Sequence, residues 1–328
     1  MKSVSFIRPR RLRTNAVIRD LVADVHVRAS QLVMPYFVIA GVGQRESIAS
    51  MPGIDRVSID VLVRDIEKAY KTGLRNVLLF GVPGNECKDP YAQAAASDDG
   101  LVPQAVRALR AVFGRDLWIS TDVCLCPYTD HGHCGFVQHG VVQNDASLDA
   151  LVAMALAHAD AGADMVAPSD MMDGRVAAIR HALEERSLYD VGIMAYSVKY
   201  ASAFYGPFRD AAHSAPGMGD RKSYQMDPRC SRDALREARL DEFEGADIIM
   251  VKPALAYLDV IRAVRETVSV PVACYNVSAE YSMVKAAAAQ GWVDECAVVL
   301  ESLIAMKRAG ADIIISYHTR DLLAAGVL

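Results

Sequence analysis

One short stretch of the chain, Asp122–Gly135, combines three cysteines with two histidines. The cysteines are Cys124, Cys126 and Cys134, and the histidines are His131 and His133. Thiolate and imidazole are the ligands that zinc prefers in proteins. Three cysteines alone would leave the fourth zinc position open for water or substrate, as catalysis requires, whereas an added histidine would close it. The spacing predicts a metal site and leaves both forms open, with incidental loop cysteines as the alternative.

Two lysines come after apolar runs in the sequence, Lys252 directly and Lys199 three residues later. Ile248–Val251 is rich in β-branched residues, which is typical of a strand buried on both faces, and Lys252 follows it directly. Lys199 follows a second such run, Gly192–Tyr196. Burial disfavours the ammonium form, and a second lysine nearby disfavours it further, so such a side chain becomes a nucleophilic amine that forms Schiff bases with carbonyl groups. The alternative is a lysine that simply reaches solvent from the end of its strand.

A long connection without clear periodicity begins at Lys199. Its glycines and prolines suit a hinged cover over a site, and we expect this lid to span about 199–229. Arg209 and Arg221 lie within it and would clamp a substrate carboxylate, because a guanidinium group matches a carboxylate with two parallel hydrogen bonds. Solvated loop charges are the alternative. Tyr205 and Gln225 in the same segment are further candidates for substrate contact.

These residues need a scaffold, and the chain repeats one unit that provides it: a helix, a glycine, a short turn and a buried strand. The predicted strands are 32–39, 77–80, 117–123, 165–167, 192–196, 248–251, 270–275 and 313–317. The predicted helices are 58–70, 105–113, 148–161, 176–188, 233–243, 258–267 and 293–309. About eight such units close a (β/α)8 TIM barrel. A doubly wound open sheet is the alternative, but Gly41-Val42-Gly43 after the first strand does not match its phosphate loop.

Barrel enzymes draw their sites from residues just past the carboxyl ends of the strands. In this chain those positions hold Asp122, Cys124, Cys126, Ser169, Lys199, Lys252, Tyr275, Ser278 and Tyr317. Amines would hold carbonyl groups as Schiff bases, arginines would hold carboxylates, and a metal would act as a Lewis acid. The residues therefore predict a Schiff-base condensing enzyme or lyase that acts on small keto acids.

Composition limits the other possibilities. The chain has 328 residues, is 52% hydrophobic and carries a net charge of −5, so we expect neither a basic nucleic-acid surface nor a membrane span. Seven cysteines are too few and too unevenly spaced for a disulfide scaffold, which indicates a reducing, cytoplasmic setting. Residues 1–31 carry an arginine cluster and no strong periodicity, and we interpret them as an arm outside a catalytic domain that spans 32–328.

Several long motifs resemble the porphobilinogen synthase (5-aminolevulinate dehydratase) family. Gly245–Tyr257 is similar to that family's active-site signature, with Ala254 at a position that is often glycine. Asp122–Gly135 resembles its zinc-type metal loop, and the segments 167–175, 219–228 and 275–281 resemble further family blocks. The resemblance runs from the arginine arm to the final strand.

The resemblance implies a lyase that condenses two 5-aminolevulinate molecules to porphobilinogen with loss of two waters, in tetrapyrrole (haem) synthesis. It implies that Lys199 binds the first substrate and Lys252 the second. Arg209 and Arg221 would then hold one substrate carboxylate, while Ser278 and Tyr317 hold the other.

The resemblance also implies a metal and an assembly. The three cysteines would hold zinc with an open position, and Asp122 beside it would assist proton transfer. Glu237 falls where many bacterial members bind an allosteric magnesium between subunits, although a helix-surface glutamate is more often simply solvated. The arm would wrap a neighbouring subunit of a homo-octamer, which gives the arginine cluster an intersubunit role.

Two other functions are alternatives to this one. A class I aldolase on the same barrel would need one Schiff-base lysine and no thiolate-bound metal, so the cysteine loop argues against it. A non-enzymatic zinc-binding assembly protein would have no use for lysines at the ends of two barrel strands.

Overall fold

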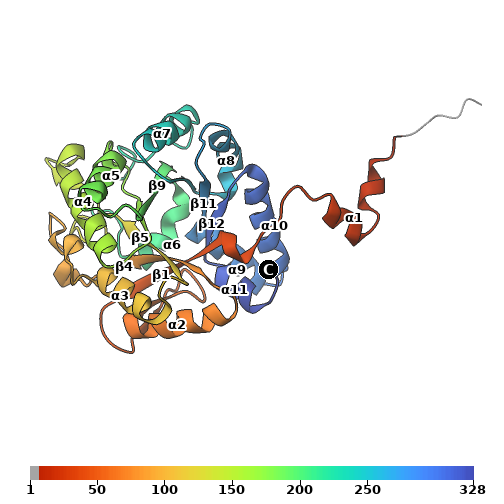
Figure 1. The fold of residues 1–328 in the computed structure, drawn as a ribbon, viewed down its shortest axis with the longest axis horizontal. Coiled ribbons are helices and arrows are strands. Elements are labelled where there is room, and N and C mark those ends of the chain that lie inside the picture. The colour runs from red at the N-terminus through yellow and green to blue at the C-terminus, as the bar shows by residue number, and fades with distance from the viewer. Residues whose placement is uncertain (1–6) are drawn as a thin grey trace, which may run out of the picture.

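The computed structural model describes residues 7–328, and eight parallel strands in it form a closed barrel (Figure 1). The barrel strands are β1 (Leu32–Ile39), β4 (Asn76–Gly81), β5 (Trp118–Val123), β8 (Met165–Pro168), β9 (Gly192–Lys199), β10 (Ile248–Lys252), β11 (Val272–Asn276) and β12 (Ile313–Ser316). They pair in that order, and the ring closes where Leu32 of β1 lies opposite Ile314 of β12. The predicted (β/α)8 TIM barrel is confirmed.

Helices surround this barrel on its outside (Figure 1). They are α2 (Ile59–Lys71), α3 (Leu101–Phe113), α4 (Asn144–Asp160), α5 (Arg175–Glu185), α7 (Arg232–Phe243), α8 (Leu258–Arg265), α9 (Ser278–Ala289), α10 (Glu295–Ala309) and α11 (Thr319–Ala324). Every predicted strand and helix forms, with ends that shift by at most about four residues, as is usual for boundaries read from sequence. No helix within residues 7–328 has both the length and the apolar character needed to cross a membrane.

Several short elements were not predicted. The small hairpins are β2 (Arg45–Ser47) with β3 (Asp55–Ser58) and β6 (Phe136–Gln138) with β7 (Val141–Gln143), and the short helices are α1 (Ala16–Leu21) and α6 (Gly206–Ala211). The helices α9 and α11 were also missed. The residues that α9 buries are Ser278, Glu280 and Tyr281, which form no apolar stripe at helical spacing.

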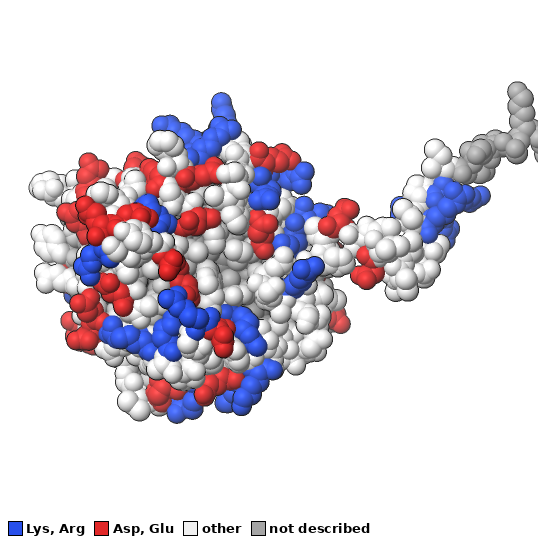
Figure 2. Space-filling model, viewed as in Figure 1, with Lys and Arg blue, Asp and Glu red and all other residues white. Residues whose placement is uncertain are grey.

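The arm predicted over 1–31 is described from residue 7 onward, and its first six residues lie outside the described part. It holds a 3-10 turn over Pro9–Arg13 and the helix α1, and neither element buries a residue. The segment extends away from the barrel before β1 begins, and basic side chains gather on its outer part (Figures 1 and 2). A segment with so little self-packing gains little stability from its own contacts.

The tripeptide Gly-Ala-Asp occurs at 162–164, 245–247 and 310–312, each time just before a barrel strand. Its aspartates form hydrogen bonds that connect neighbouring strands at their amino ends. Asp247, which precedes β10, accepts hydrogen bonds from the backbone N of Ile193 in β9 (2.7 Å) and from Arg180 of α5 (2.6 Å). Asp164 and Asp312 bond in the same way to the strands before theirs, through the backbone N of Ile119 (2.8 Å) and Val272 (2.9 Å). Each aspartate therefore joins two neighbouring strands and one helix, which fixes the barrel register far from the catalytic end.

Replacing Gly245 with alanine is expected to lower the free energy of unfolding by about 1–3 kcal/mol. Gly245 ends α7 with a φ of +102°, and an added Cβ would lie 3.0 Å from the Cγ atom of Arg180. Urea denaturation measures the change. Gly206→Ala is the matched control, because nothing lies within 4 Å of the added Cβ, and equal stability of the two variants would contradict this explanation.

Candidate active site

The two lysines meet because β9 and β10 are neighbours and because β9 contains an irregularity. Lys199 pairs in register with Lys252, but between Ala195 and Val198 two residues of β9 lie opposite a single residue of β10. Simple alternation from Tyr196 would point Lys199 out of the barrel, and this bulge turns it inward. Both lysines are buried, and their Nζ atoms lie 5.5 Å (Lys199) and 4.9 Å (Lys252) from the centre of the Tyr196 ring.

Lys252 lies in an aromatic cage. Its Nζ atom is 4.5 Å from the ring centre of Tyr275, 5.0 Å from that of Phe208 and 5.2 Å from that of Tyr205. Burial, together with the positive charge of Lys199, lowers the pKa of Lys252 to about 7. A large fraction of this side chain is therefore a neutral amine near neutral pH, which is the form that attacks a carbonyl group.

Lys199 lies on the polar side of the site. Its ammonium group donates a hydrogen bond to the backbone carbonyl of Ser169, at the end of β8. Asp122, at the end of β5, is buried as well, and its Oδ1 atom has no hydrogen-bond partner within the described chain. Burial raises the pKa of Asp122 to about 6, although the positive charge of Lys199 opposes this shift.

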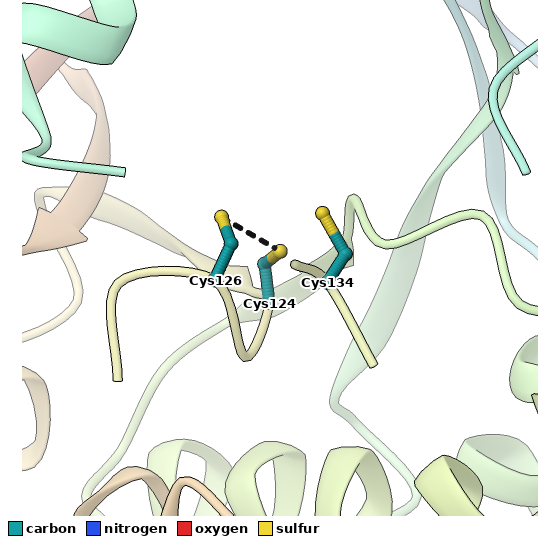
Figure 3. A group of neighbouring side chains, drawn as sticks. All are labelled: Cys124, Cys126 and Cys134. Atoms are coloured by element: carbon teal, nitrogen blue, oxygen red, sulfur yellow. Dashed lines mark hydrogen bonds between the residues drawn. The ribbon is translucent and has the colours of Figure 1, made fainter. Parts of the chain in front are cut away.

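The three predicted cysteines come together at the end of β5. All three thiols are buried, and their sulfur atoms lie within 4.8 Å of one another (Figure 3). The sulfurs of Cys124 and Cys126 are 3.2 Å apart, which is too far for a disulfide, and all seven cysteines are free. Three thiolates bound to one tetrahedral ion with metal–sulfur distances of about 2.3 Å would need only a small adjustment from this arrangement. The cluster therefore fits a single thiophilic metal ion.

Neither histidine of the loop joins the cluster. His133 uses both ring nitrogens elsewhere, with Nδ1 3.1 Å from the Tyr224 hydroxyl and Nε2 3.0 Å from the carbonyl oxygen of Met218. His131 accepts a hydrogen bond from the backbone N of His133 through its Nδ1 atom (3.1 Å). Among residues 7–328, the cysteine triplet is the one group of three or more such donors close enough to share an ion. The arrangement favours three protein ligands with an open fourth position.

The segment predicted as a lid lies over the ends of β9 and β10. Tyr200 donates its backbone N–H to the carbonyl of Lys252 (3.0 Å), and Met226 returns to donate to the carbonyl of Lys199 (3.0 Å). Farther out, the segment fastens to the cysteine loop, since Arg221 donates to the carbonyl of Gly132 (2.8 Å). The segment therefore covers both lysines and the metal loop at once.

The two lid arginines form a positive site without a carboxylate partner in the described chain. Arg221 is buried and Arg209 about half-buried, and neither makes an ion pair with a carboxylate of residues 7–328. Burial and the positive charge of Arg221 lower the pKa of Arg209. The side-chain oxygen and nitrogen of Gln225 are buried without partners in the same segment. Orphaned donors of this kind indicate a site for an anionic ligand.

The remaining predicted substrate contacts surround the Lys252 cage. The Tyr317 hydroxyl lies 3.0 Å from that of Tyr275, and the Tyr205 hydroxyl donates to the carbonyl of Lys252 (3.1 Å). Ser278 begins α9, and its Oγ atom accepts a hydrogen bond from the backbone N of Phe208 (3.0 Å). The structure thus brings the strand-end residues into one region. Sequence reasoning missed Tyr196 and Phe208, and no motif marks either of them as part of the site.

Glu237 lies apart from this region, on the outer helix α7. Its side chain is half-buried, and burial together with the nearby carboxylate of Asp241 raises its pKa. Asp241 itself forms a buried, two-fold hydrogen-bonded pair with Arg175 (3.0 and 2.9 Å). Within the described chain, Glu237 contributes to no cluster of metal-binding donors, and its predicted role as a magnesium ligand stays a prediction.

Comparisons with known proteins agree with this geometry. The family model described as delta-aminolevulinic acid dehydratase matches residues 6–325. The delta-aminolevulinic acid dehydratase of Halalkalibacterium halodurans is 51% identical over 321 residues, covering 98% of this chain and 97% of that protein. The enzyme of the same name from Staphylococcus aureus is 50% identical, covering 97% of this chain and 98% of that protein.

A solved structure is similar as well. The delta-aminolevulinic acid dehydratase (porphobilinogen synthase) of Toxoplasma gondii, crystallised with its reaction product porphobilinogen, superimposes with a TM-score of 0.96 at 44% identity. The match covers 98% of this chain and 92% of that one. On the family model and these whole-length identities, the chain belongs to the delta-aminolevulinic acid dehydratase family.

Proposed function

We propose that this chain is the lyase of its family, which condenses two molecules of 5-aminolevulinate to porphobilinogen with release of two waters, and that Lys199 and Lys252 hold the two substrates. The observation that carries the proposal is the pair of buried lysines, opposite each other on neighbouring strands and beside three clustered thiols. An aldolase would use one such lysine, whereas joining two keto acids gives each lysine a substrate.

Each lysine would act as a nucleophile toward one ketone. The neutral amine adds to the carbonyl carbon, the carbonyl oxygen leaves as water, and the resulting protonated imine withdraws electrons from its neighbouring carbon atoms. Lys199 would receive the first substrate and Lys252 the second. Formation of one carbon–carbon and one carbon–nitrogen bond between the substrates then returns both lysines as free amines, so that two waters leave per product.

We assign zinc to Cys124, Cys126 and Cys134. Zinc bound there supplies a positive charge that polarises a carbonyl or amine group at its open position. Asp122, two residues before Cys124, would accept or donate a proton on the substrate beside it. Burial keeps water away from this carboxyl group, which strengthens its interaction with Lys199.

The carboxylates of the two substrates would bind on opposite sides of the lysines. Arg209 and Arg221, assisted by Tyr205 and Gln225, would bind one of them, which is supported by the unpaired donors of the lid. Ser278 and Tyr317 would bind the other, and Ser169 would contact the substrate on Lys199.

We also propose roles for the lid, the N-terminal arm and Glu237. The lid over about 199–229 would open to admit substrate and close for reaction. The arm over residues 1–31 would wrap a neighbouring subunit of a homo-octamer, and Glu237 would bind an allosteric magnesium between subunits. We assign the enzyme to the cytoplasm, where it would serve tetrapyrrole synthesis without nucleic-acid or membrane partners.

The trapping of substrate on Lys252 is expected to depend on pH with a midpoint near 7. The lowered pKa means that the amine is protonated and unreactive below this pH and neutral above it. Brief reduction with cyanoborohydride at a series of pH values, followed by peptide mass spectrometry, measures the yield. Lys68 is the control, because it is exposed and belongs to an outer helix away from the site. A Lys252 midpoint near 10 would contradict the proposed activation.

Incubation with 5-aminolevulinate tests the proposed function directly. Purified protein supplied with zinc should form porphobilinogen, and prior treatment with a strong chelator should abolish product until zinc is returned. Failure to form product with zinc present would refute the reaction. Full activity after chelation would refute the metal while leaving the reaction intact.

A further inference from the structure

The lid helix α6 carries two side chains toward the site. Phe208 places its ring in the Lys252 cage, and Arg209 provides a guanidinium group that makes no ion pair within residues 7–328. The helix has only six residues, Gly206–Ala211, which is too short to be stable by itself. Its position, and with it the position of Arg209, must come from contacts with the rest of the barrel.

The buried guanidinium of Arg56 supplies such contacts. Arg56 belongs to β3, which pairs with β1 so that Arg56 lies opposite Phe37. Its Nε atom donates to the carbonyl of Ala211 (2.6 Å), and its Nη2 atom donates to the carbonyl of Asp210 (2.6 Å). Carbonyl groups at the carboxyl end of a helix have no partner within the helix, and a cation there also interacts favourably with the helix dipole.

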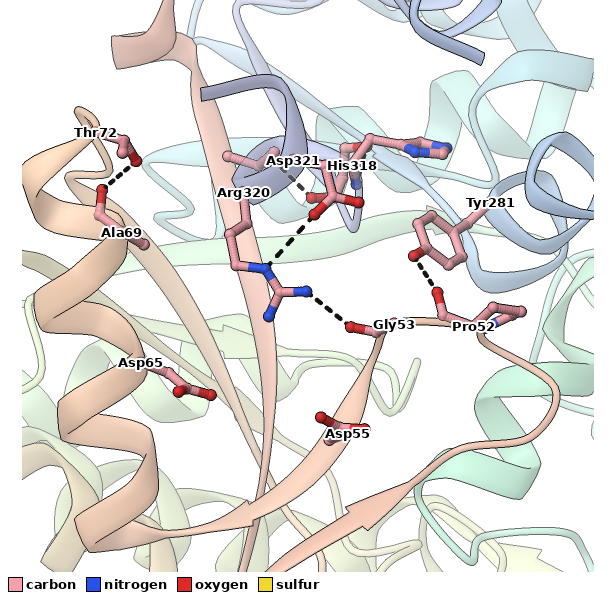
Figure 4. A network of polar contacts seen from close by, with 12 residues as sticks. Pro52, Gly53, Asp55, Asp65, Ala69, Thr72, Tyr281, His318, Arg320 and Asp321 are labelled. Atoms are coloured by element: carbon pink, nitrogen blue, oxygen red, sulfur yellow. Dashed lines mark hydrogen bonds and ion pairs between the residues drawn. The ribbon is translucent and has the colours of Figure 1, made fainter. Parts of the chain in front are cut away.

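Arg56 is held by a segment that is itself fixed to the barrel. We call Ser50–Arg56 the brace. Figure 4 shows two of its attachments: the Tyr281 hydroxyl donates to the carbonyl of Pro52 (2.6 Å), and Arg320 donates to the carbonyl of Gly53 (2.8 Å). Tyr281 and Arg320 belong to the barrel helices α9 and α11, so the brace is anchored from two sides.

The brace reaches the lid at a second point as well. The Ser50 hydroxyl donates to the side-chain carboxylate of Asp210 (2.6 Å), and Ser282 of α9 donates to the carbonyl of Ser50 (2.6 Å). Three hydrogen bonds therefore connect the brace to the last two residues of α6, and all three are short. Arg56 makes two of them from one rigid, planar group, which specifies direction as well as distance.

We infer that Arg56 is a positioning residue of the substrate site, which fixes the lid helix α6 and thereby aims Arg209 at a substrate carboxylate. The inference rests on the proposed function, since it takes Arg209 as a carboxylate ligand. Arg56 itself bonds to backbone carbonyls of the lid, so it acts on substrate through Arg209 and Phe208. Loss of this group should weaken substrate binding more than it slows the chemical step at the lysines.

Steady-state kinetics of three variants test the inference. Arg56→Ala is expected to raise KM for 5-aminolevulinate about 10- to 100-fold, which corresponds to the loss of about one charge-assisted hydrogen bond from Arg209 to the substrate, with a smaller fall in kcat. Arg56→Lys keeps the charge but lacks the two-pronged geometry, and it should recover part of the loss. Glu46→Ala is the matched control, because Glu46 is an exposed partner of Arg56 at 3.7 Å and does not contact α6 through any hydrogen bond of the described chain. It should stay within about twofold of wild type.

Limited trypsin digestion separates positioning from general stability. In Arg56→Ala, cleavage after Arg209, Arg221 and Lys222 should accelerate while the thermal unfolding of the barrel changes little. Arg56→Lys provides the same comparison if the alanine variant does not fold.

A wild-type KM together with a wild-type cleavage rate in both variants would overturn the inference. A lower unfolding temperature with unchanged lid cleavage and KM would overturn it too, because Arg56 would then be only structural. The digestion experiment does not require an active enzyme. If the wild-type protein forms no porphobilinogen, the proposed function is refuted, but the rate of lid cleavage still tests whether Arg56 positions the lid.

Discussion

Replacing Lys252 with alanine is expected to abolish porphobilinogen formation, with a loss of at least about 10⁴-fold in kcat. Lys252 is the buried amine whose pKa burial lowers to about 7, and the aromatic rings around it offer no other nucleophile. The second substrate would then lack its covalent attachment, and the bonds between the two substrates would not form. A continuous assay of porphobilinogen with zinc present measures the loss.

Two companion variants make this result specific to the amine. Lys252→Arg keeps a positive charge in the cage but cannot form a Schiff base, so it should be as inactive as the alanine variant. Lys68→Ala removes an exposed lysine of α2 and should keep wild-type activity. Measurable turnover in Lys252→Arg would mean that charge, and not covalent attachment, is what the site requires of this residue.

Replacing Cys134 with alanine is expected to weaken zinc binding by more than about 100-fold, since even the loss of an outer partner of a metal ligand costs 10- to 100-fold. Cys134 provides one of only three clustered sulfurs, and within the described residues no histidine of the loop lies close enough to the other two sulfurs to belong to the cluster. Activity should be lost at low zinc and should return in part when zinc is raised. Metal analysis after dialysis, together with activity at a series of zinc concentrations, measures both effects.

The matched control for this experiment is Cys87→Ser. Cys87 is an exposed cysteine outside the cluster, so its loss should change neither the bound zinc nor the activity. A Cys134→Ala variant that binds zinc as tightly as the wild type would show that the three sulfurs do not form the metal site.

The barrel and the identity of most strand-end residues follow from sequence because they depend on local patterns. Buried strands such as Ile248–Lys252 are continuous apolar runs, and five of the eight barrel strands (β4, β5, β8, β10 and β12) are preceded by a glycine that ends a helix in a conformation that other residues rarely adopt. The carboxyl ends of the parallel barrel strands lie on one face. The residues that follow these ends in the sequence therefore predict most of the candidate site.

Features that depend on irregular geometry did not follow. The bulge in β9 turns Lys199 into the barrel, and strict alternation would have placed it outside. The cage around Lys252 takes Phe208 from a lid helix whose six residues show no periodic signal. No sequence pattern points to Arg56 either. Its proposed role comes from hydrogen bonds to residues about 155 positions away in the chain, at the end of α6.

The choice between an open and a closed metal site also required coordinates. From spacing alone, His131 and His133 were equal candidates for a fourth ligand. Both ring nitrogens of His133 lie within hydrogen-bond distance of lid residues, Tyr224 and Met218, so His133 is not available as the fourth ligand. These two residues are more than eighty positions away in the chain. Contacts of such sequence separation are set by the fold and not by the local motif.

Borohydride reduction of the zinc-loaded enzyme in the presence of 5-aminolevulinate, followed by peptide mapping, tests the central idea most directly. Two amines that each hold one substrate should give a substrate-sized mass increase on Lys252 and on Lys199, and on no other lysine. Porphobilinogen formation accompanied by adducts on neither of these residues, or on a lysine elsewhere in the chain, would contradict it.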